Sequence, residues 1–402
     1  MSVAEDVQSL ESRYILQLYR RTPIVLTEGR GVVLRDQDGR EYLDFISGIG
    51  VTSLGHGHPA LVAAIADQAQ TLLHTSNLYF HPLQGQVAER LAALSGLPRT
   101  FFCNSGAEAV EACVKFARRY WFSQGTPRPG FVALAHSFHG RTCGAVSLTW
   151  NEHYRQPFEP LLPGVTFVDP DDPDALLAAV SESTAAVIVE AIQGEGGVRP
   201  LSPAFARAVG DACRRTGALL MADEVQCGLG RTGHPFAYAT LGLEPDLVAV
   251  GKALGGGVPV GAALASEAVG GALTYGDHGS TYGGNLLACR AALVFLQELV
   301  DGGLLAHVGR VGARLTAALD ALAARRPSVV TRRGAGLMQG LELRTDAAPV
   351  VEAALRRGLL VNRTAQTVVR LLPPLTIADA DIDRGVALLE EAIADVEKER
   401  TA

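Results

Sequence analysis

The stretch that organises this chain reads Asp246-Leu-Val-Ala-Val-Gly-Lys252-Ala-Leu-Gly-Gly-Gly-Val-Pro-Val-Gly261. It sets Lys252 between an apolar run and a cluster of glycines. A buried ammonium group is costly, so a lysine in this setting loses its proton readily and becomes an amine that forms an imine with an aldehyde. A lysine that simply reaches solvent from a strand end fits these residues as well. A phosphate-binding P-loop does not fit, because G-x-x-x-x-G-K-[ST] needs glycine at Asp246 and a hydroxyl at Ala253.

Composition excludes several classes of protein. The chain has 402 residues, of which 48% are hydrophobic and 19% charged, which is typical of a folded protein of about two domains. A formal net charge of -7 without a long basic run offers nothing to nucleic acid. The acidic segment 1–7 lacks the pattern of a secretory signal, and no apolar run is long enough to span a bilayer. We therefore expect a cytoplasmic protein without nucleic-acid or membrane partners.

The six cysteines are scattered without a C-x-x-C pair, which is typical of reduced thiols rather than disulfides. The histidine pairs His56-x-His58 and His136-x-x-His139 lack the acidic and cysteine partners that zinc spacing needs. We expect no metal site.

The first 290 residues alternate between strand and helix patterns. Asp172-Pro173 and Ser202-Pro203 each supply an N-cap followed by proline at the first helical position, which marks two helix starts. Apolar strands alternating with helices predict a mostly parallel sheet covered on both faces. The expected elements are a helix at 9–19, a strand pair at 32–45, a helix at 59–73, strands at 100–103, 131–135, 165–168, 185–189, 218–222 and 247–250, and a helix that begins near Gly106.

Beyond about residue 290 the pattern changes to a mixed one. We expect a long helix at 291–324 broken near Gly302-Gly303, strands near 329, 337–343 and 368–372, and helices at 350–357 and 378–397. The predicted fold class is α/β, with a large mostly parallel sheet domain and a smaller α+β domain. The expected parts are an N-terminal segment 1–55 that packs with the small domain, a large domain 56–290 and a C-terminal domain 291–402.

Unusual polar residues follow the expected strands. Ligands of parallel sheets sit at the carboxyl ends of the strands. Three features there match one cofactor, pyridoxal phosphate: Lys252 for its aldehyde, the helix start Ser105-Gly106-Ala107 for its phosphate, and Asp223 for its ring nitrogen. Each has an ordinary alternative, since a Ser-Gly turn often opens a helix and Asp223-Glu224 also resembles the acidic motif of nucleotide hydrolases.

A rival signal lies in Gly228-Leu-Gly230-Arg-Thr-Gly233, which matches the dinucleotide motif G-x-G-x-x-G, with Asp246 near the expected acidic position. Five residues separate it from the preceding strand, and Arg231-Thr-Gly-His-Pro235 does not open a helix. A nicotinamide-dependent dehydrogenase is therefore a weak alternative, and an inactive structural homologue a weaker one, because such a homologue would be expected to lose Lys252.

At this point the residues resemble a known family, and the resemblance covers nearly the whole chain. The sequence is similar to the class III aminotransferases, in particular the acetylornithine aminotransferase group. The matching motifs are Phe102-Cys-Asn-Ser-Gly-Ala-Glu-Ala109, Ser137-Phe-His-Gly-Arg-Thr142, Glu190-Ala-Ile-Gln-Gly-Glu-Gly-Gly197, Asp223-Glu-Val-Gln-Cys-Gly-Leu-Gly-Arg-Thr-Gly233, Gly251-Lys-Ala-Leu-Gly-Gly-Gly257, His278-Gly-Ser-Thr-Tyr-Gly-Gly-Asn285 and Val369-Arg-Leu-Leu-Pro-Pro374.

The resemblance implies a fold-type I pyridoxal-phosphate enzyme that works as a homodimer with shared active sites. It implies that Lys252 binds the cofactor aldehyde and moves the substrate proton, and that Asp223 pairs with the ring nitrogen. The remaining roles that it implies are cofactor contacts by Ser105, Gly106, Ala107, Phe138, Gln226 and, from the neighbouring subunit, Thr281, with substrate contacts by Arg141, Ser280 and Arg370 and a switching carboxylate at Glu195.

The implied reaction moves the terminal amine of N-acetylornithine to 2-oxoglutarate, in arginine or lysine biosynthesis. A close alternative is the lysine-pathway or ornithine-pathway enzyme whose substrate is attached to an acidic amino-group carrier protein, which predicts a basic rim around the pocket. Succinyldiaminopimelate, free ornithine and gamma-aminobutyrate also remain open as donors. Cys227 and Leu286 depart from the usual family residues close to the site, which leaves the donor undecided.

Overall fold

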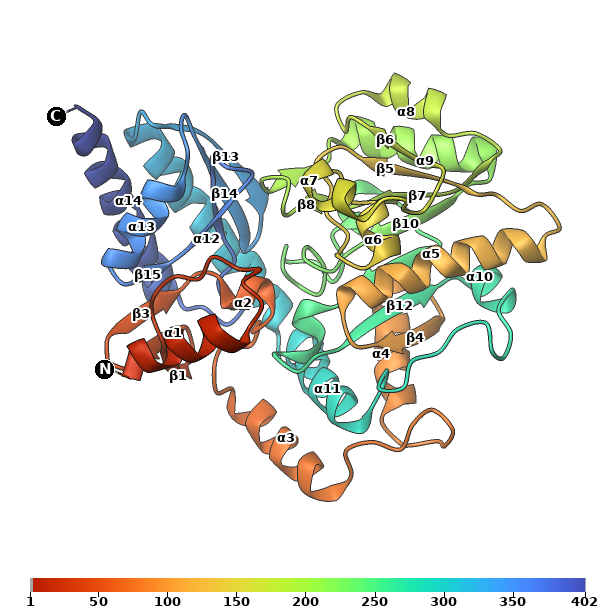
Figure 1. Cartoon of the computed structure of the whole chain (residues 1–402), viewed down its shortest axis with the longest axis horizontal. Coiled ribbons are helices and arrows are strands. Elements are labelled where there is room, and N and C mark those ends of the chain that lie inside the picture. The colour runs from red at the N-terminus through yellow and green to blue at the C-terminus, as the bar shows by residue number, and fades with distance from the viewer. Residues whose placement is uncertain (1–2, 402) are drawn as a thin grey trace.

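The computed structural model describes residues 3–401 and shows two groups of elements side by side (Figure 1). The larger group surrounds a seven-stranded sheet in the order β4-β12-β11-β10-β7-β5-β6. All strands run in one direction except β12, which is antiparallel to both neighbours, so the expected mostly parallel sheet is confirmed. The strands are β4 (Arg99–Cys103), β5 (Gly130–Leu134), β6 (Val165–Val168), β7 (Thr184–Val189), β10 (Leu219–Asp223), β11 (Leu247–Val250) and β12 (Gly261–Ala265).

Strand β12 was not expected from the sequence. Its residues, Gly-Ala-Ala-Leu-Ala, are small and not β-branched, so their strand propensity is low. The strand forms because it fills the space between β4 and β11, where all five residues are buried.

Helices cover both faces of the large sheet. The two expected N-caps are confirmed: the Asp172 side chain accepts a hydrogen bond from the Ala175 N–H (2.9 Å), and Ser202 accepts one from the Phe205 N–H (3.1 Å). The helices of this group are α3 (Pro59–Thr71), α4 (Gln84–Ser95), α5 (Gly106–Ser123), α6 (Cys143–Ser147), α7 (Glu152–Arg155), α8 (Pro173–Ala179), α9 (Pro203–Thr216), α10 (Glu267–Gly271) and α11 (Leu286–Val300).

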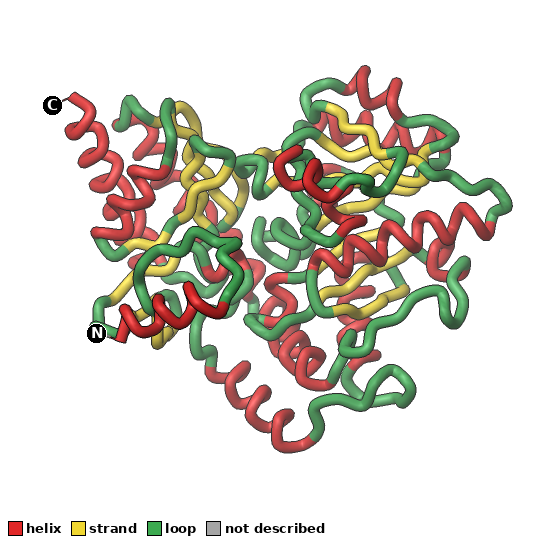
Figure 2. The backbone as a smooth tube through the Cα atoms, in the orientation of Figure 1, coloured by secondary structure: helices red, strands yellow, loops and turns green. Residues whose placement is uncertain are grey.

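The second group is built on an antiparallel sheet in the order β13-β14-β17-β16. Figure 2 shows its helices on the outer side of these strands. Its elements are β13 (Val329–Ala335), β14 (Met338–Leu343), β16 (Asn362–Thr364), β17 (Val368–Leu371), α12 (Leu304–Arg325), α13 (Ala348–Arg356) and α14 (Asp379–Thr401).

The N-terminal strands join the second group, because β3 pairs in parallel with β15 (Leu359–Leu360). The hairpin of β2 (Val33–Asp36) and β3 (Glu41–Asp44) confirms the strand pair expected at 32–45, and β1 (Leu26–Arg30) adds a further strand. The division of the chain into three domains stays a prediction. The remaining short elements are α2 (Ser47–Gly50), β8 (Ile192–Gln193), β9 (Arg199–Pro200) and the 3-10 helices η1 (Gln156–Phe158), η2 (Tyr238–Leu241) and η3 (Lys252–Gly255).

Two helix predictions need correction. The leading helix α1 spans Val3–Tyr14 rather than 9–19, and the apolar side chains of Leu16, Leu18 and Tyr19 beyond it are exposed, so they give a continued helix no face to bury. The long helix expected at 291–324 is broken at Gly302-Gly303 as predicted, with a bend of 65°, but it begins at Leu286 because Asn285 caps it.

Among residues 3–401, no single helix is long and apolar enough to cross a membrane. The bent pair α11 and α12 reaches that length only together, and most of the large apolar side chains of both helices are buried in the protein.

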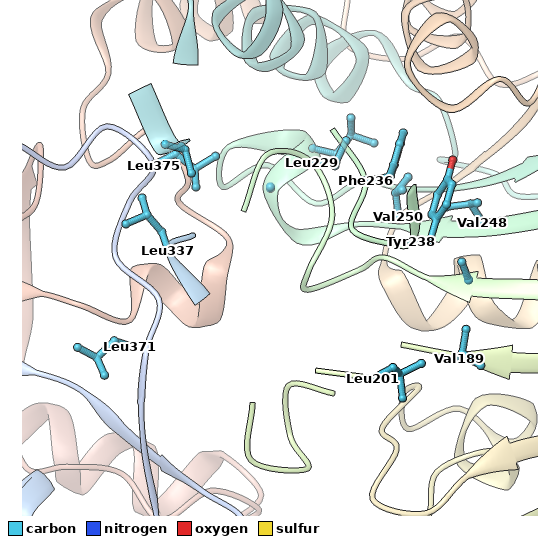
Figure 3. Packing of buried hydrophobic residues seen from close by; sticks show 14 of the residues in the cluster. Val189, Leu201, Leu229, Phe236, Tyr238, Val248, Val250, Leu337, Leu371 and Leu375 are labelled. Atoms are coloured by element: carbon cyan, nitrogen blue, oxygen red, sulfur yellow. The ribbon is translucent and has the colours of Figure 1, made fainter. Parts of the chain in front are cut away.

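One hydrophobic cluster links the two groups. Figure 3 shows Val248 and Val250 of β11 in the same cluster as Leu371 of β17, with Leu337 and Leu375 from the loops beside it. Because these residues come from both sheets, the two groups share one hydrophobic core.

Arg231 is a further link between the groups. Its side chain is only 2% exposed, and its guanidinium donates hydrogen bonds to the Leu337 and Pro373 carbonyls and to the Ser53 hydroxyl. Burial lowers the pKa of Arg231 to about 9, although the charge of Asp44 opposes this.

The glycine-rich loop at 228–233 therefore carries the arginine that links the two groups of elements. The next element is η2, so this loop opens no α-helix and lacks the helix start that a dinucleotide site needs.

We predict that Arg231→Met lowers the free energy of unfolding by about 3 kcal/mol, because it leaves buried carbonyl groups without donors. Chemical unfolding followed by circular dichroism measures this change. The matched control is Arg214→Met, since Arg214 is exposed and its loss should change stability by less than about 0.5 kcal/mol. Equal stability of the two variants would contradict the role assigned to Arg231.

Candidate active site

The carboxyl ends of the parallel strands meet around Lys252, as the sequence predicted. Lys252 follows β11 directly and begins η3 with a φ of 38°, a left-handed conformation that is costly for a side chain larger than glycine. It lines a cavity of about 730 Å³. Burial lowers the pKa of Lys252, Glu195 opposes this change, and the positive charge of Arg370 adds to it. A neutral amine is therefore easier to form here than on a surface lysine.

Three other predicted residues line the same cavity: Phe138, Arg141 and Glu195. The Arg141 guanidinium lies 3.4 Å from the ring centroid of Tyr154 and 5.7 Å from that of Phe138, so two aromatic faces support it. Its exposed end is free to meet an anion that enters the cavity.

Asp223 ends β10 and is 5% exposed. Its Oδ1 accepts a hydrogen bond from the Val225 N–H (3.0 Å), and its Oδ2 lies 2.7 Å from Nδ1 of the fully buried His139. Burial alone would lower the pKa of His139, but the hydrogen bond to Asp223 and the charges of Asp223 and Glu190 raise it. In the sequence, His139 stood out only in a histidine pair that lacks the partners of a zinc site. Its place five residues after β5 gives no sign that Asp223 is its partner.

Glu190 is a second buried carboxylate that the sequence did not assign. It accepts hydrogen bonds from the N–H groups of Phe138 (3.0 Å) and Gly194 (3.1 Å), so it joins the loop after β5 to the loop after β7. Burial raises the pKa of Glu190 to about 7, with the charge of His139 opposing the change. Glu224 is another buried carboxylate. It accepts hydrogen bonds from the N–H groups of Ala237 and Tyr238 (both 2.8 Å), so its role is to hold this loop in place.

The start of α5 lies next to Lys252. The Ser105 hydroxyl caps the helix by accepting from the Glu108 N–H (3.2 Å), and the helix leaves the N–H groups of Gly106 and Ala107 without intrahelical acceptors. A Cβ on Gly106 would meet Val225 at 2.5 Å, and Gly251 packs against the Gly106 backbone. Only glycine allows this approach, which sets the positive end of the helix beside the lysine.

Ser280 and Thr281 lie outside the cavity lining. The Ser280 hydroxyl accepts hydrogen bonds from the Gly283 N–H (3.0 Å) and from the side-chain amide of Asn104 (3.3 Å), so it lies near the start of α5 in its own chain. Thr281 is exposed on the surface. The structure of one chain therefore does not bring Thr281 together with the other predicted site residues.

A polar network closes the cavity beside Glu195. Its Oε1 lies 2.6 Å from Nη1 of Arg370, a side chain only 1% exposed. The Gln226 amide joins both: its oxygen accepts from Arg370 Nη1 (3.1 Å), and its nitrogen donates to Glu195 (3.4 Å). Burial would raise the pKa of Glu195, but the charge and hydrogen bond of Arg370 lower it overall. Thr364 fixes the main chain here, since its hydroxyl donates to the Glu195 carbonyl (2.7 Å).

Comparisons with known proteins agree with this geometry. The chain is 44% identical over 399 residues to the acetylornithine aminotransferase of Methanocaldococcus jannaschii, which covers 98% of this chain and 99% of that protein. It is 45% identical over 381 residues to the acetylornithine aminotransferase of Aquifex aeolicus, covering 94% of this chain and all of the relative.

Solved structures show the same fold. The ornithine aminotransferase of Toxoplasma gondii superposes with a TM-score of 0.95 at 33% identity, covering 99% of this chain and 97% of that one. The acetylornithine aminotransferase of Elizabethkingia anophelis superposes with a TM-score of 0.86 at 29% identity, covering 98% and 99%. The predicted fold-type I architecture is confirmed.

The model of one family, described as aminotransferase class-III, matches residues 15–393. That range includes the lysine after β11, the carboxylate after β10 and both members of the ion pair that closes the cavity. With matches of this length to named relatives, the chain belongs to the class III aminotransferases.

Proposed function

We propose that this aminotransferase moves the terminal amine of N-acetylornithine to 2-oxoglutarate. The observation that carries the proposal is the pairing of the buried Arg370 with Glu195 in the wall of the cavity that holds Lys252. A paired arginine suits a donor without a carboxylate beside the reacting carbon, and an unpaired one suits 2-oxoglutarate. The names of the most similar relatives given above support the same donor.

The family works with pyridoxal phosphate, and the residues of this chain fit that cofactor. The N–H groups of Gly106 and Ala107 have no intrahelical acceptors, so the start of α5 suits a phosphate. The carboxylate of Asp223 suits a protonated ring nitrogen, with His139 holding its second oxygen. Phe138, which lines the cavity, would stack on the ring in this proposal. In this proposal the Gln226 amide reaches the ring hydroxyl as well as the ion pair that it contacts here.

When bound, pyridoxal phosphate supplies an aldehyde and a ring that withdraws electrons from the reacting carbon. Lys252 would hold the cofactor through its aldehyde, and its free amine would serve as the base that takes a proton from the substrate carbon and as the acid that delivers the same proton to the cofactor carbon. Burial favours the neutral amine that this step requires. His139 would hold the Asp223 carboxylate in the orientation that faces the ring nitrogen.

Arg141 and Arg370 bind different substrate carboxylates in this proposal. In the first half-reaction Arg141 holds the donor carboxylate, and Glu195 neutralises Arg370. In the second half-reaction Glu195 releases Arg370, which then holds the carboxylate beside the reacting carbon of 2-oxoglutarate. In this proposal Ser280 also contacts the substrate, and its hydroxyl is held by the hydrogen bond from Asn104.

The rim of the cavity favours a small donor over one attached to an acidic carrier protein. Of the two arginines in the described lining, Arg363 is already paired with both carboxylate oxygens of Asp346 at 2.7 Å. The other large side chains of the lining include the aromatic residues Tyr19, Trp150 and Tyr154. The described lining itself therefore offers an acidic carrier few unpaired basic side chains.

The proposal includes a homodimer. Long loops at 72–83 and 272–285 run along one side of the molecule (Figure 1), joined by hydrogen bonds from Asn77 to the Ser280 and Gly283 carbonyls. This surface includes Thr281 and carries exposed apolar side chains: Leu72, Leu73, Leu78, Tyr79, Phe80, Tyr275 and Tyr282. Exposed apolar patches of this kind mark protein interfaces, and a second copy here would present Thr281 to its partner.

A cytoplasmic location is also part of the proposal. Five of the cysteines are buried as free thiols, and Cys143 is exposed as a free thiol, which suits a reducing compartment.

We predict that Lys252→Ala abolishes the yellow absorbance of the cofactor-bound protein and lowers turnover by about a thousandfold or more, because no other amine lines the cavity in the described chain. Visible spectra and coupled assays with N-acetylornithine measure both effects. Lys398→Ala, at the far end of α14, is the control and should behave like the unaltered protein. A yellow, active Lys252→Ala variant would remove the basis of the proposal.

We predict that Glu195→Ala slows the N-acetylornithine half-reaction about tenfold more than the glutamate half-reaction, because it leaves Arg370 unneutralised. Stopped-flow spectra with each amino donor separate the two halves. Glu182→Ala, at an exposed position, is the control. Equal losses in the two halves would contradict a switching role for Glu195.

We predict that Phe80→Asp produces monomers and weakens cofactor binding, because a charge replaces an exposed aromatic ring at the proposed interface. Analytical ultracentrifugation gives the mass, and equilibrium dialysis gives the cofactor affinity. Phe158→Asp, at an exposed aromatic residue on η1, is the matched control. A dimer that survives the Phe80 change would place the interface elsewhere.

A further inference from the structure

Asn362 lies directly across from Arg370 in the small sheet. The two residues are paired in register between β16 and β17, and the Asn362 side-chain oxygen accepts a hydrogen bond from Arg370 Nε at 3.3 Å. This contact is on the opposite end of the guanidinium from Nη1, which meets Glu195 and Gln226. The pairing of β16 with β17 therefore places a neutral acceptor, the Asn362 amide oxygen, at the Nε of Arg370.

The recorded partners of Arg370 differ in charge. Glu195 brings a carboxylate, whereas Gln226 and Asn362 bring only amide oxygens. Arg370 is 1% exposed, so bulk water cannot replace a hydrogen bond that its guanidinium loses. When Glu195 moves away, as the proposed function requires, the side-chain amides of Gln226 and Asn362 still accept hydrogen bonds from Arg370.

We infer that Asn362 is a positioning residue that holds the Arg370 guanidinium in place, without neutralising it, while Glu195 is released. The inference rests on the proposed function and adds the residue that makes its switch selective for 2-oxo dicarboxylates. An apolar residue at this position would leave Nε without an acceptor. A carboxylate would neutralise the guanidinium permanently and remove the attraction for the incoming substrate carboxylate. An amide avoids both outcomes.

The effect should be confined to one half-reaction. With Glu195 in place, the 2.6 Å ion pair already orients Arg370, so the donor half-reaction does not depend on Asn362. With Glu195 released, the orientation and the free charge of Arg370 both depend on its amide partners. A residue with only a structural role would affect the two halves alike.

The test compares Asn362→Asp and Asn362→Leu in the cofactor-loaded protein, by single-turnover spectra with glutamate and with N-acetylornithine. For Asn362→Asp we expect the apparent dissociation constant of glutamate to rise about tenfold, as for the loss of a charge-assisted contact, with N-acetylornithine changed less than about twofold. For Asn362→Leu, which removes a neutral acceptor held at 3.3 Å from the guanidinium, we expect a rise of about threefold for glutamate alone.

A double variant provides a second measurement. In E195Q/N362D the introduced carboxylate replaces the charge that E195Q removes, so the N-acetylornithine half-reaction impaired in E195Q should recover, while glutamate stays weak. Equal changes for both donors, or an unchanged glutamate affinity in Asn362→Asp, would overturn the role of Asn362. If the unaltered protein reacts with glutamate but not with N-acetylornithine, the proposed donor is wrong, and the glutamate measurements still decide the role of Asn362.

Discussion

The site depends on the electrostatic interaction between a buried positive charge, Arg370, and the buried amine of Lys252. Arg370 is almost fully enclosed, and its charge lowers the pKa of Lys252, while Glu195 opposes that effect. A buried guanidinium is tolerated only with close partners, so the wall of the cavity has to supply them. The carboxylate of Glu195 and the amides of Gln226 and Asn362 meet this need, and the first of them is also open to the cavity.

The same network joins the two halves of the molecule. Arg370 and Asn362 belong to the small sheet, whereas Glu195 and Gln226 stand on loops that follow strands of the large sheet. Thr364 of the small sheet donates a hydrogen bond to the Glu195 carbonyl. Arg231, from the loop after β10, donates one to the Leu337 carbonyl beside the small sheet. The shared hydrophobic core gives these contacts a fixed frame, so that one side chain can move while its backbone stays in place.

The central residues of the site could be predicted because their neighbours in the sequence are unusual. Lys252 stands among glycines, and Asp223 ends a strand of apolar residues. Gln226 was expected at the ring hydroxyl, and the structure adds its contacts with the ion pair. His139, Glu190 and Asn362 could not be assigned in this way, because their partners are 84, 52 and 8 residues away along the chain. Strand β12 was missed for a different reason, since its burial and not its residue types makes it a strand.

The sequence by itself determined most of the strands and helices of the large sheet, the family motifs and the choice of Lys252 as the candidate lysine, because these depend on local periodicity and on residues adjacent in the chain. Tertiary structure alone decided which polar groups meet. Sheet order brings His139 to Asp223, and the β16–β17 register brings Asn362 to Arg370. Electrostatic interaction falls off with distance in space and not along the chain, so the pKa of Lys252 and the pairing of Arg370 are properties of the folded protein.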